Sequence, residues 1–435
     1  MAEAPKKIQV LIVAYYWPPS AGSGVQRWLK FVKYLPEYGI APVVLTPENP
    51  DAEWTDASLE AEIPKDIEVL KLPVWEPYRF WRRIKSAFKG GRKVASNTPS
   101  HESGLARWIR GNFFLPDPRI FWVKPAAAFL EDFVRSRNIK ILITTGPPHS
   151  MHLIGLRVKK NFPDVKWVAD FRDPWSTWGA LKKFKPSSIA MGIHRRLERS
   201  VLDHADEILT ISPFYVRQLS ALSGKSVHLF TNGFDEEDMG RIHKTPTDRF
   251  TIRHVGILHP ECDPWPFLTI FKTWYLIHGL THKIRLVFTG TVTGAFLSAL
   301  QSDDLLREVV EIETPVSHKN LLDLYGKTDA LLLVLTGYRD AEGFLPGKLY
   351  EYLGTGLPIV AVGPAAGDAS LILESSGAGK MFSEDDEAGV QGILTSCYEE
   401  WLNKINRPSL PPASLKWSRK HITADLATFL KSLHS

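Results

Sequence analysis

The sequence has only two cysteines among its 435 residues, Cys262 and Cys397. Two cysteines cannot build a disulfide framework, and their separation does not fit a zinc site, so we expect a reducing, cytoplasmic environment. No apolar run reaches the roughly eighteen residues of a transmembrane helix, and we expect no secretory signal. The net charge of +5 is small for this length, which argues against a nucleic-acid-binding protein.

What is present is a globular composition, 44% apolar and 23% charged, in a chain long enough for two or three domains. Short runs rich in Val and Ile alternate with segments of helical periodicity. In the first half, the predicted strands are Ile8–Tyr15, Pro42–Thr46, Ile139–Thr144, Trp167–Asp170, Glu207–Thr210 and Val227–Phe230. The predicted helices include Val25–Tyr38, His152–Lys160 and Ile189–Leu202, with Ser150 as the N-cap of the second. This alternation predicts a parallel sheet covered by helices on both faces.

The pattern starts again after a polar segment between Asn232 and Asp248. Here the predicted strands are Phe250–Ile257, Ile284–Thr289, Val309–Glu313, Ala330–Leu335 and Pro358–Val362. The predicted helices are Pro266–Ile277, His318–Tyr325, Lys348–Leu353 and Ala369–Ser375. We therefore predict two α/β domains, at residues 1–235 and 236–415. The amphipathic residues 416–435 either cap the second domain or cross back to the first.

Residues 75–124 interrupt the alternation of strands and helices. Seven Lys or Arg residues and no acidic residue lie between Arg79 and Lys93, interleaved with aromatic side chains. One explanation is an amphipathic helix at an anionic membrane surface. The other is a surface helix that packs its aromatic side on the domain and leaves its basic side in water. No nucleic-acid-binding motif accompanies the basic residues.

Ligands of open parallel sheets bind beyond the carboxyl ends of the strands, so the loops after strands are the candidate sites. Gly22 and Gly24 follow the first strand and precede a helix, where backbone amides and the helix dipole favour an anion. Arg27 stands where the dinucleotide fingerprint has its third glycine, which disfavours a dinucleotide cofactor. A plain loop with two glycines would give the same pattern.

Two later loops of the first half carry polar side chains that suit a substrate. His149 and His152 follow the strand at Ile139–Thr144, and each is a candidate hydrogen-bonding group or a structural polar residue. Asp170, Arg172 and Asp173 follow the next strand, before Pro174 keeps the chain from becoming helical. An ion pair of Arg172 with Asp170 or Asp173 is the structural alternative for this cluster.

In the second half, Lys348 follows Pro346 and Gly347 in the first turn of a predicted helix. The helix dipole disfavours a cation there, so an anionic ligand beside Lys348 would explain its position. Glu351 lies one turn further on, near the same face, and suits hydroxyl groups of the same ligand. The alternative is an intrahelical Lys348–Glu351 pair.

Three stretches resemble the retaining glycosyltransferases of family four: AYYWPPSAGSGVQRWLKFVKYLP, ADFRDPW and GFLPGKLYEYLGTGLPIVAVGP. The resemblance covers nearly the whole chain in order. It implies the GT-B fold, in which two Rossmann-like, doubly wound parallel-sheet domains face each other across a cleft. It also implies a nucleotide-sugar donor held mainly by the second domain, an acceptor held mainly by the first, a final helix that crosses back, and no metal or other cofactor.

The resemblance assigns roles to several residues. Glu351 matches the glutamate that holds the donor ribose, and Gly22 and Gly24 match the loop at the diphosphate. Glu342 lies nine residues before Glu351, one more than in the Glu-x7-Glu motif of the family. The donor sugar is therefore expected to contact Glu342 or the backbone of Phe344, Leu345, Pro346 and Gly347. The loop after the first strand of the second half offers His259 and no Arg or Lys, so Lys348 is the expected phosphate partner.

Together these observations predict a retaining glycosyltransferase that moves a sugar to a glycan or lipid-linked acceptor for a cell-surface polysaccharide. The expected catalytic residues are Arg172, Asp173, Glu342 and Lys348, and the expected acceptor-binding residues are His149, His152 and Asp170. We expect the protein in the cytoplasm, with a peripheral place at the inner face of the membrane. A nucleotide-sugar epimerase and a non-catalytic sugar- or lipid-binding protein are the alternatives.

Overall fold

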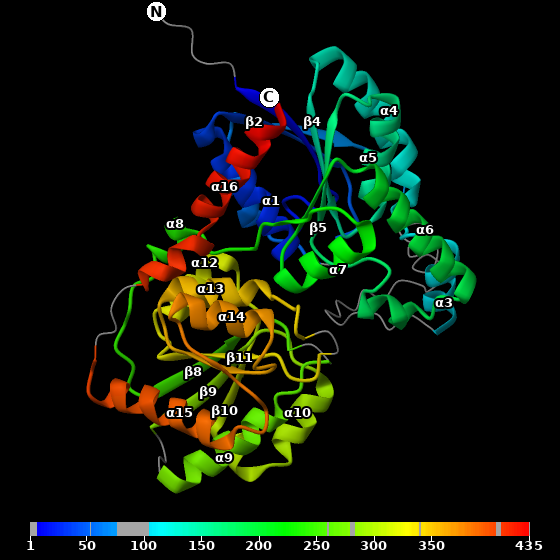
Figure 1. Cartoon of the computed structure of the whole chain (residues 1–435). Coiled ribbons are helices and arrows are strands. Elements are labelled where there is room, and N and C mark those ends of the chain that lie inside the picture. The colour runs from blue at the N-terminus through cyan, green and yellow to red at the C-terminus, as the bar shows by residue number, and fades with distance from the viewer. Residues whose placement is uncertain are drawn as a thin grey trace, which may run out of the picture. The chain divides into compact units, whose positions relative to one another are not determined.

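The computed structural model describes residues 7–52, 54–75, 104–258, 261–278, 283–338, 341–405 and 410–434. The chain forms two compact units, Met1–Phe230 with Thr423–Ser435, and Thr231–Ile422. Each unit has one parallel sheet with helices on both faces, which confirms the predicted α/β class (Figure 1). The basic residues Arg79 to Lys93 lie outside the described residues.

The sheet of the first unit has the strand order β3-β2-β1-β4-β5-β6-β7. Its strands are β1 Ile8–Val13, β2 Ile40–Pro47, β3 Glu68–Leu72, β4 Ile141–Gly146, β5 Lys166–Phe171, β6 Glu207–Thr210 and β7 His228–Leu229. All neighbouring strands run parallel, and β1 lies between β2 and β4. Because the strand order reverses between β1 and β4, the loops after these two strands occupy the place where such sheets bind ligands.

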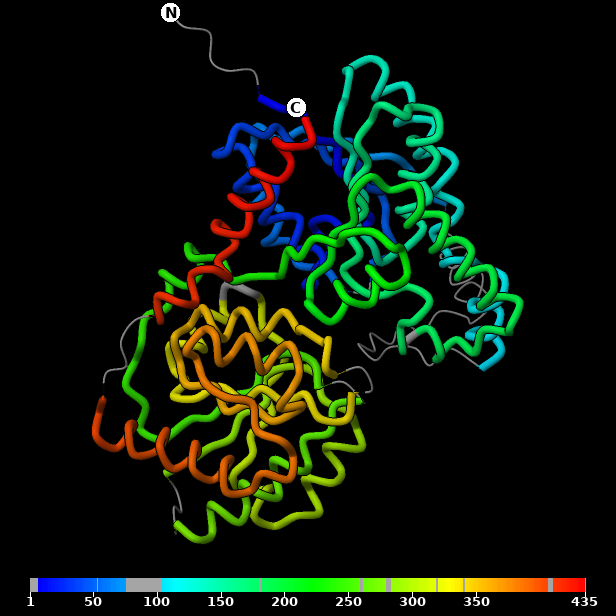
Figure 2. The backbone as a smooth tube through the Cα atoms, viewed as in Figure 1, coloured from blue at the N-terminus to red at the C-terminus, as the bar shows by residue number. Residues whose placement is uncertain are grey.

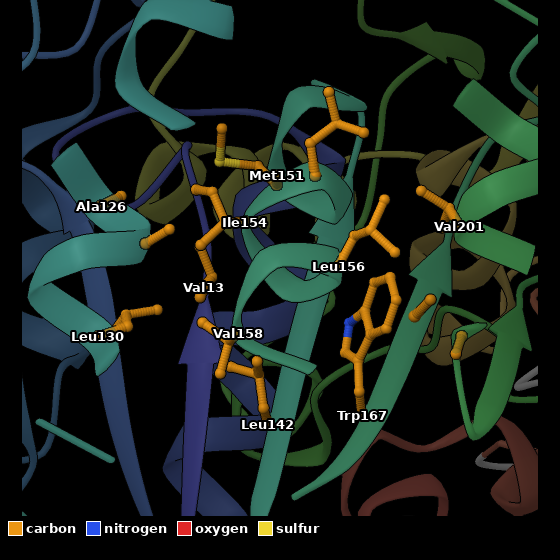
Figure 3. Close-up of a cluster of buried hydrophobic side chains, with 14 of the residues drawn as sticks. Val13, Ala126, Leu130, Leu142, Met151, Ile154, Leu156, Val158, Trp167 and Val201 are labelled. Carbon is orange, nitrogen blue, oxygen red and sulfur yellow. The ribbon is translucent and has the colours of Figure 1, made fainter. Parts of the chain in front are cut away.

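The helices of the first unit cover both faces of this sheet. They are α1 Ser23–Tyr34, α3 Gly104–Phe113, α4 Ile120–Arg137, α5 Ser150–Asn161, α6 Ser188–His204 and α7 Pro213–Ser223, with short 3₁₀ helices at Leu35–Tyr38, Ala57–Glu62 and η3 Gly179–Phe184. Figure 3 shows the core under α4 and α5, where these side chains meet: Val13, Ala126, Leu130, Leu142, Met151, Ile154, Val158 and Trp167. Each fully buried aliphatic side chain stabilises the fold by about 1.5–3 kcal/mol.

The last helix, α16 (Arg419–His434), belongs largely to the first unit, although it follows the second in sequence. The Phe429 ring lies 4.6 Å from the His228 ring and 5.6 Å from the Phe230 ring, measured between centroids. Figure 2 shows the red C-terminal trace returning to this unit. The side of α16 that carries Phe429 thus covers the end of β7.

The second unit has the strand order β10-β9-β8-β11-β12-β13, again all parallel. Its strands are β8 Phe250–Val255, β9 Ile284–Thr289, β10 Val310–Glu313, β11 Ala330–Val334, β12 Ile359–Val362 and β13 Met381–Phe382. Its helices are α8 Glu236–Met239, α9 Trp265–His278, α10 Gly294–Gln301, α11 Asp304–Val309, α12 His318–Tyr325, α13 Gly347–Thr355, α14 Asp368–Ser376 and α15 Glu387–Leu402, with a 3₁₀ helix at Pro412–Trp417. Two apolar clusters, one on each face, hold these helices to the sheet. The order reverses between β8 and β11, which makes the ends of these strands the candidate site.

Candidate functional site

In the first unit, the loops after β1, β4 and β5 meet at the side chain of Arg172. Its Nε donates a hydrogen bond to the carbonyl of Gly146 at 3.1 Å, and its Nη2 donates to the carbonyl of Pro147. A Cβ atom at Gly24 would overlap the Arg172 guanidinium, so only glycine permits this close approach. The structure therefore brings together Gly24 and Arg172, which are far apart in the sequence.

The N-terminus of α1 is built to leave its first amides accessible. Gly22 precedes the helix with φ 119°, a conformation that favours glycine, and no side chain caps the helix. The first turn of an α-helix has amide groups without intrahelical acceptors, and the dipole makes this end favourable for an anion. This geometry agrees with an anion site at the Gly22–Gly24 loop.

Arg27, the residue that breaks the dinucleotide fingerprint, forms a buried ion pair with Asp170. Its Nη2 lies 2.9 Å from Asp170 Oδ1 and its Nε 3.2 Å from Oδ2, and both side chains are fully buried. Trp28 Nε1 and Thr145 Oγ1 donate to the same carboxylate at 2.7 and 2.8 Å, and Arg27 Nη1 donates to the Phe230 carbonyl. The pair ties α1 to β5, a role that sequence reasoning missed although the fingerprint position drew attention to Arg27.

The structural alternative of an ion pair between Arg172 and Asp170 or Asp173 is wrong. Asp170 pairs with Arg27, and the hydrogen bonds of Arg172 go to carbonyl oxygens. Burial lowers the pKa of Arg172 and raises the pKa of Asp173, and the nearby Arg172 charge partly offsets the second effect. A partly buried guanidinium with neutral acceptors and a carboxyl group beside it can orient a polar or anionic substrate.

The two predicted histidines, His149 and His152, lie side by side at the start of α5, with ring centroids 5.9 Å apart. Gly146 makes room for them, since a Cβ there would lie 2.6 Å from His152 Nε2 and 3.1 Å from His149 Nδ1. His149 stacks on Trp175 at 4.8 Å, and His152 stacks on Phe171 at 4.4 Å.

Both imidazoles are neutral at physiological pH. Burial lowers the pKa of His152 to about 3, and it holds the pKa of His149 well below its usual range. His152 Nδ1 contacts Thr144 Oγ1 at 2.9 Å, whereas its buried Nε2 has no hydrogen-bond partner among the described residues. A neutral imidazole with one unsatisfied nitrogen suits a hydroxyl group better than an anion.

The prediction that Ser150 caps the helix that follows it is wrong, because Ser150 is the first residue of α5. Asp117 takes the capping role from a distant segment: its carboxylate accepts from Ser150 N at 2.9 Å and from Ser150 Oγ at 2.6 Å. An acidic side chain at this end of the helix also complements the dipole. The loop after β4 is thereby fixed to the start of α4.

In the second unit, Lys348 stands in the first turn of α13 and reaches the end of β8. Its Nζ donates to His254 Nε2 at 2.9 Å and lies over Gly256. No carboxylate of the described residues forms an ion pair with it. Burial lowers the pKa of Lys348 to about 8, against the opposing effect of Cys262 and Glu351. The result is a partly buried cation at the N-terminus of a helix, where only an anion would compensate it.

His254 was missed by sequence reasoning because it lies inside the strand and not in the loop after it. Burial and the Lys348 ammonium hold its pKa well below the usual range, so it accepts as a neutral imidazole. Its buried Nδ1 has no hydrogen-bond partner among the described residues. The strand thus positions Lys348 without neutralising it.

The alternative of an intrahelical Lys348–Glu351 pair is wrong, since the two side chains have different partners. Glu351 accepts a hydrogen bond from the hydroxyl of Tyr325, the last residue of α12, at 3.1 Å. Burial, followed by the Glu351 charge, raises the pKa of Tyr325 well above its ordinary value. One carboxylate oxygen of Glu351 is thereby fixed, and its remaining acceptor positions suit ligand hydroxyls.

The loop before α13 contains the other residues expected at the donor sugar. Glu342 is exposed, and its carbonyl accepts from Asp368 N at 2.7 Å, which ties this loop to α14. The Phe344 ring lies 4.7 Å from the Tyr338 ring, and Leu345 is buried in the core. Pro346 is the N-cap of α13 and Gly347 its first residue. His259 lies outside the described residues.

In the described parts of the chain, no cluster of three or more His, Cys, Asp or Glu side chains is arranged to hold a metal ion. No helix among the residues that the structure describes has the length and apolar character needed to cross a bilayer.

Comparison with known proteins gives one family match and several matches of fold. Residues 22–233 match the glycosyl transferase 4-like domain. The fold resembles a glycosyltransferase from Rickettsia africae (12% identity, TM-score 0.61, 99% of both chains), and Anabaena Alr3699/HepE in complex with UDP (12%, 0.63, 98% of this chain and 100% of that one). It also resembles sucrose-phosphate synthase from Thermosynechococcus elongatus (12%, 0.61, 98% and 99%). No curated protein matched by sequence.

Proposed function

We propose that this glycosyltransferase, whose residues 22–233 match the glycosyl transferase 4-like domain and whose two units have the GT-B fold, uses a nucleotide-sugar donor and retains the anomeric configuration. The acceptor in this proposal is a glycan or lipid-linked glycan of a cell-surface polysaccharide. The enzyme would work in the cytoplasm, at the inner face of the membrane.

The observation that carries the donor assignment is the position of Lys348. Its ammonium lies at the N-terminus of α13, held by a neutral imidazole and by no carboxylate of the described residues. A diphosphate there would receive a charge-assisted hydrogen bond and the favourable end of the helix dipole. As the glycosidic bond breaks, the same groups would stabilise the charge that develops on the nucleoside diphosphate.

The other residues of the second unit fit around such a donor. Glu351, oriented by Tyr325, would accept from the ribose hydroxyls. Glu342 and the backbone from Phe344 to Gly347 would contact the sugar, and His259 remains a candidate for the phosphates. In the first unit, the Gly22–Gly24 loop remains a proposed anion-binding site, because no side chain caps the start of α1. Alr3699/HepE, which shares the fold, was solved with UDP.

For the acceptor, we propose Arg172, Asp173, His149 and His152. Arg172 and Asp173, which are partly exposed, would orient the acceptor, and the buried rings of His149 and His152 would position the loop after β4. We revise the role of Asp170, because its buried carboxylate already accepts from Arg27, Trp28 and Thr145. Asp170 would position the loop that carries Arg172 in place of contacting the acceptor.

The test is thermal stabilisation of the purified protein by a panel of nucleoside diphosphates and nucleotide sugars. A ligand at 100 times its Kd stabilises the folded state by about 2.7 kcal/mol, which gives a visible rise in melting temperature. We expect one nucleotide base to stabilise the wild type, and Lys348→Ala and Glu351→Ala to lose the effect. No stabilisation by any of them would favour the non-catalytic binding protein, and donor conversion without an acceptor would favour the epimerase.

A further inference from the structure

Helix α3 carries a row of large apolar side chains that face solvent. Leu105, Ile109 and Phe113 follow one another at intervals of four residues, which places them along one side of the helix. Leu105 is 67% exposed and Phe113 is 70% exposed, and Trp108 packs edge-on against Phe113. We call Leu105, Trp108, Ile109 and Phe113 the α3 apolar row.

The opposite side of α3 is the side that packs on the domain. Gly111 is its buried residue, and a Cβ there would lie 2.7 Å from Phe184 Cβ in η3. Ile109 and Phe113 are each two residues from Gly111, about 200° around the helix axis. Asn112 adds hydrogen bonds to Lys185 and Ser187 that hold the end of α3 in place. The apolar row therefore points outward because the glycine side is anchored.

The segments packed around α3 carry positive charge. The stretches 104–116 and 179–189, which form α3, η3 and the start of α6, contain five cations and no acidic residue: Arg107, Arg110, Lys182, Lys183 and Lys185. Figure 1 shows α3 beside α6 at one end of the first unit. Ile189, at the start of α6, is 78% exposed and adds to the apolar surface.

We propose that the α3 apolar row binds the anionic surface of a lipid bilayer, to which the five nearby cations attract it. Apolar side chains enter the boundary between headgroups and acyl chains, while Lys and Arg attract anionic headgroups. This inference deepens the proposed function, on which it rests, by selecting a lipid-linked acceptor over a free glycan. A peripheral enzyme anchored by its first unit would meet such an acceptor at the membrane surface.

Residues 76–103 of the same chain are another candidate to bind the α3 apolar row, and charge distinguishes them from the bilayer. That stretch contains seven Lys or Arg residues and two acidic ones, so its net charge has the same sign as the surface around α3. Like charges oppose such an association, whereas anionic lipid favours the proposed one. Nucleic acid is a poor match because its phosphates gain nothing from an exposed row of Leu, Ile, Trp and Phe.

The experiment is flotation of the full-length protein with vesicles of phosphatidylcholine alone or mixed with phosphatidylglycerol. We expect binding to the mixed vesicles only, weakened by salt. The variant Ile109→Ser with Phe113→Ser should lose vesicle binding. The variant Lys182→Glu with Lys183→Glu should weaken vesicle binding by at least about 30-fold, because each lost lysine costs a little over about fivefold. The control is Leu276→Ser with Ile277→Ser, two apolar residues of α9 that are 66% and 67% exposed and should have no effect.

Nucleotide-induced stabilisation of each variant separates this inference from the proposed function. Unchanged stabilisation together with lost flotation supports the surface. Failure of the wild type to float with anionic vesicles, or equal binding by the α3 variants, overturns the surface whatever the nucleotide result. Flotation without any nucleotide effect leaves the surface supported and refutes the donor site.

Discussion

Each unit places a cation near the point where its strand order reverses, Arg27 fully buried and Lys348 partly buried, but the two cations are compensated differently. Arg27 of the first unit is fully buried, pairs with the carboxylate of Asp170 and donates to the carbonyl of Phe230. Lys348 of the second unit has a neutral imidazole. The Arg27 charge is satisfied by the protein itself, so it holds the fold together. The Lys348 charge is left for something outside the protein, which is the property expected of a phosphate-binding group.

The same contrast between internal and external partners decides which carboxylates are available to a substrate. Asp170 and Asp173 lie close together in sequence, yet the first is occupied by four hydrogen bonds from Arg27, Trp28 and Thr145. Charge alone does not indicate function at the end of a parallel strand. A charged group is available to a ligand only after its internal partners have been counted.

The largest expected effect is the loss of unfolding free energy when the buried Arg27–Asp170 pair is broken. Asp170→Ala leaves Arg27 as a buried charge without its carboxylate, and such losses cost about 3–5 kcal/mol of unfolding free energy. Urea denaturation followed by tryptophan fluorescence measures it. The control is Asp132→Ala, which removes an exposed pair with Arg135 and should cost less than about 1 kcal/mol. Equal midpoints for both variants would contradict the structural role of Asp170.

Removing Lys348, whose charge no carboxylate of the described residues pairs with, should affect nucleotide binding more than folding. Lys348→Ala deletes a charge-assisted hydrogen bond to the donor phosphate, worth about 1.5–3 kcal/mol, so nucleotide affinity should fall about 10- to 100-fold. Isothermal titration with the nucleotide identified by the panel measures this. Lys327→Ala, at an exposed lysine of the same unit, is the matched control. A fall in unfolding free energy as large as that of Asp170→Ala would erase the contrast between the two cations.

The pH dependence of binding tests the role of Lys348, because the pKa of its ammonium lies near neutrality. Its pKa of about 8 means that the ammonium is lost above that pH, and nucleotide affinity should fall up to about tenfold per pH unit. The unfolded lysine keeps its proton to about pH 10.4, so the contribution of Lys348 to unfolding free energy rises over the same interval. Binding and stability should therefore change in opposite directions. Lys348→Arg, charged throughout, should bind with no such decline, and an identical decline would refute the assignment.

The smallest effect is expected at His254, which acts through Lys348. His254→Leu removes the acceptor that favours the ammonium, so the pH at which nucleotide affinity declines should move to lower values. At pH 7 we expect a loss of only a few-fold, on the order of 1 kcal/mol for one hydrogen bond. His254→Gln keeps an acceptor and should restore most of the wild-type profile. If Leu and Gln give the same profile, His254 only fills space.

The pattern of β-branched runs and helical periodicity predicted most of the fold. The strands at Glu207–Thr210 and Ile284–Thr289 and the helix at His318–Tyr325 have the predicted bounds. The missed elements include β3, whose alternating EVLKL lies at the edge of the sheet, and the two-residue β13. Short edge strands bury little and leave a weak apolar signal.

The sequence predicted which single residues lie at the ends of the strands, but not which residues they contact. Arg172 lies in a loop after a strand, and Gly24 and Lys348 lie in the first turn of the helix that follows such a loop, so parallel topology predicts their place. Their partners are not local: Arg27 meets Asp170 across 143 residues and Lys348 meets His254 across 94. Such pairings depend on helix rotation and strand register in three dimensions, which no single-sequence pattern specifies.

The return of Thr423–Ser435 to the first unit has a consequence for biosynthesis. A ribosome releases the chain from the N-terminus, so all of the second unit emerges before the first receives its last helix. Until then, His228 and Phe230 lack the Phe429 ring that packs against them. The unit that is translated first is thus the unit that is completed last.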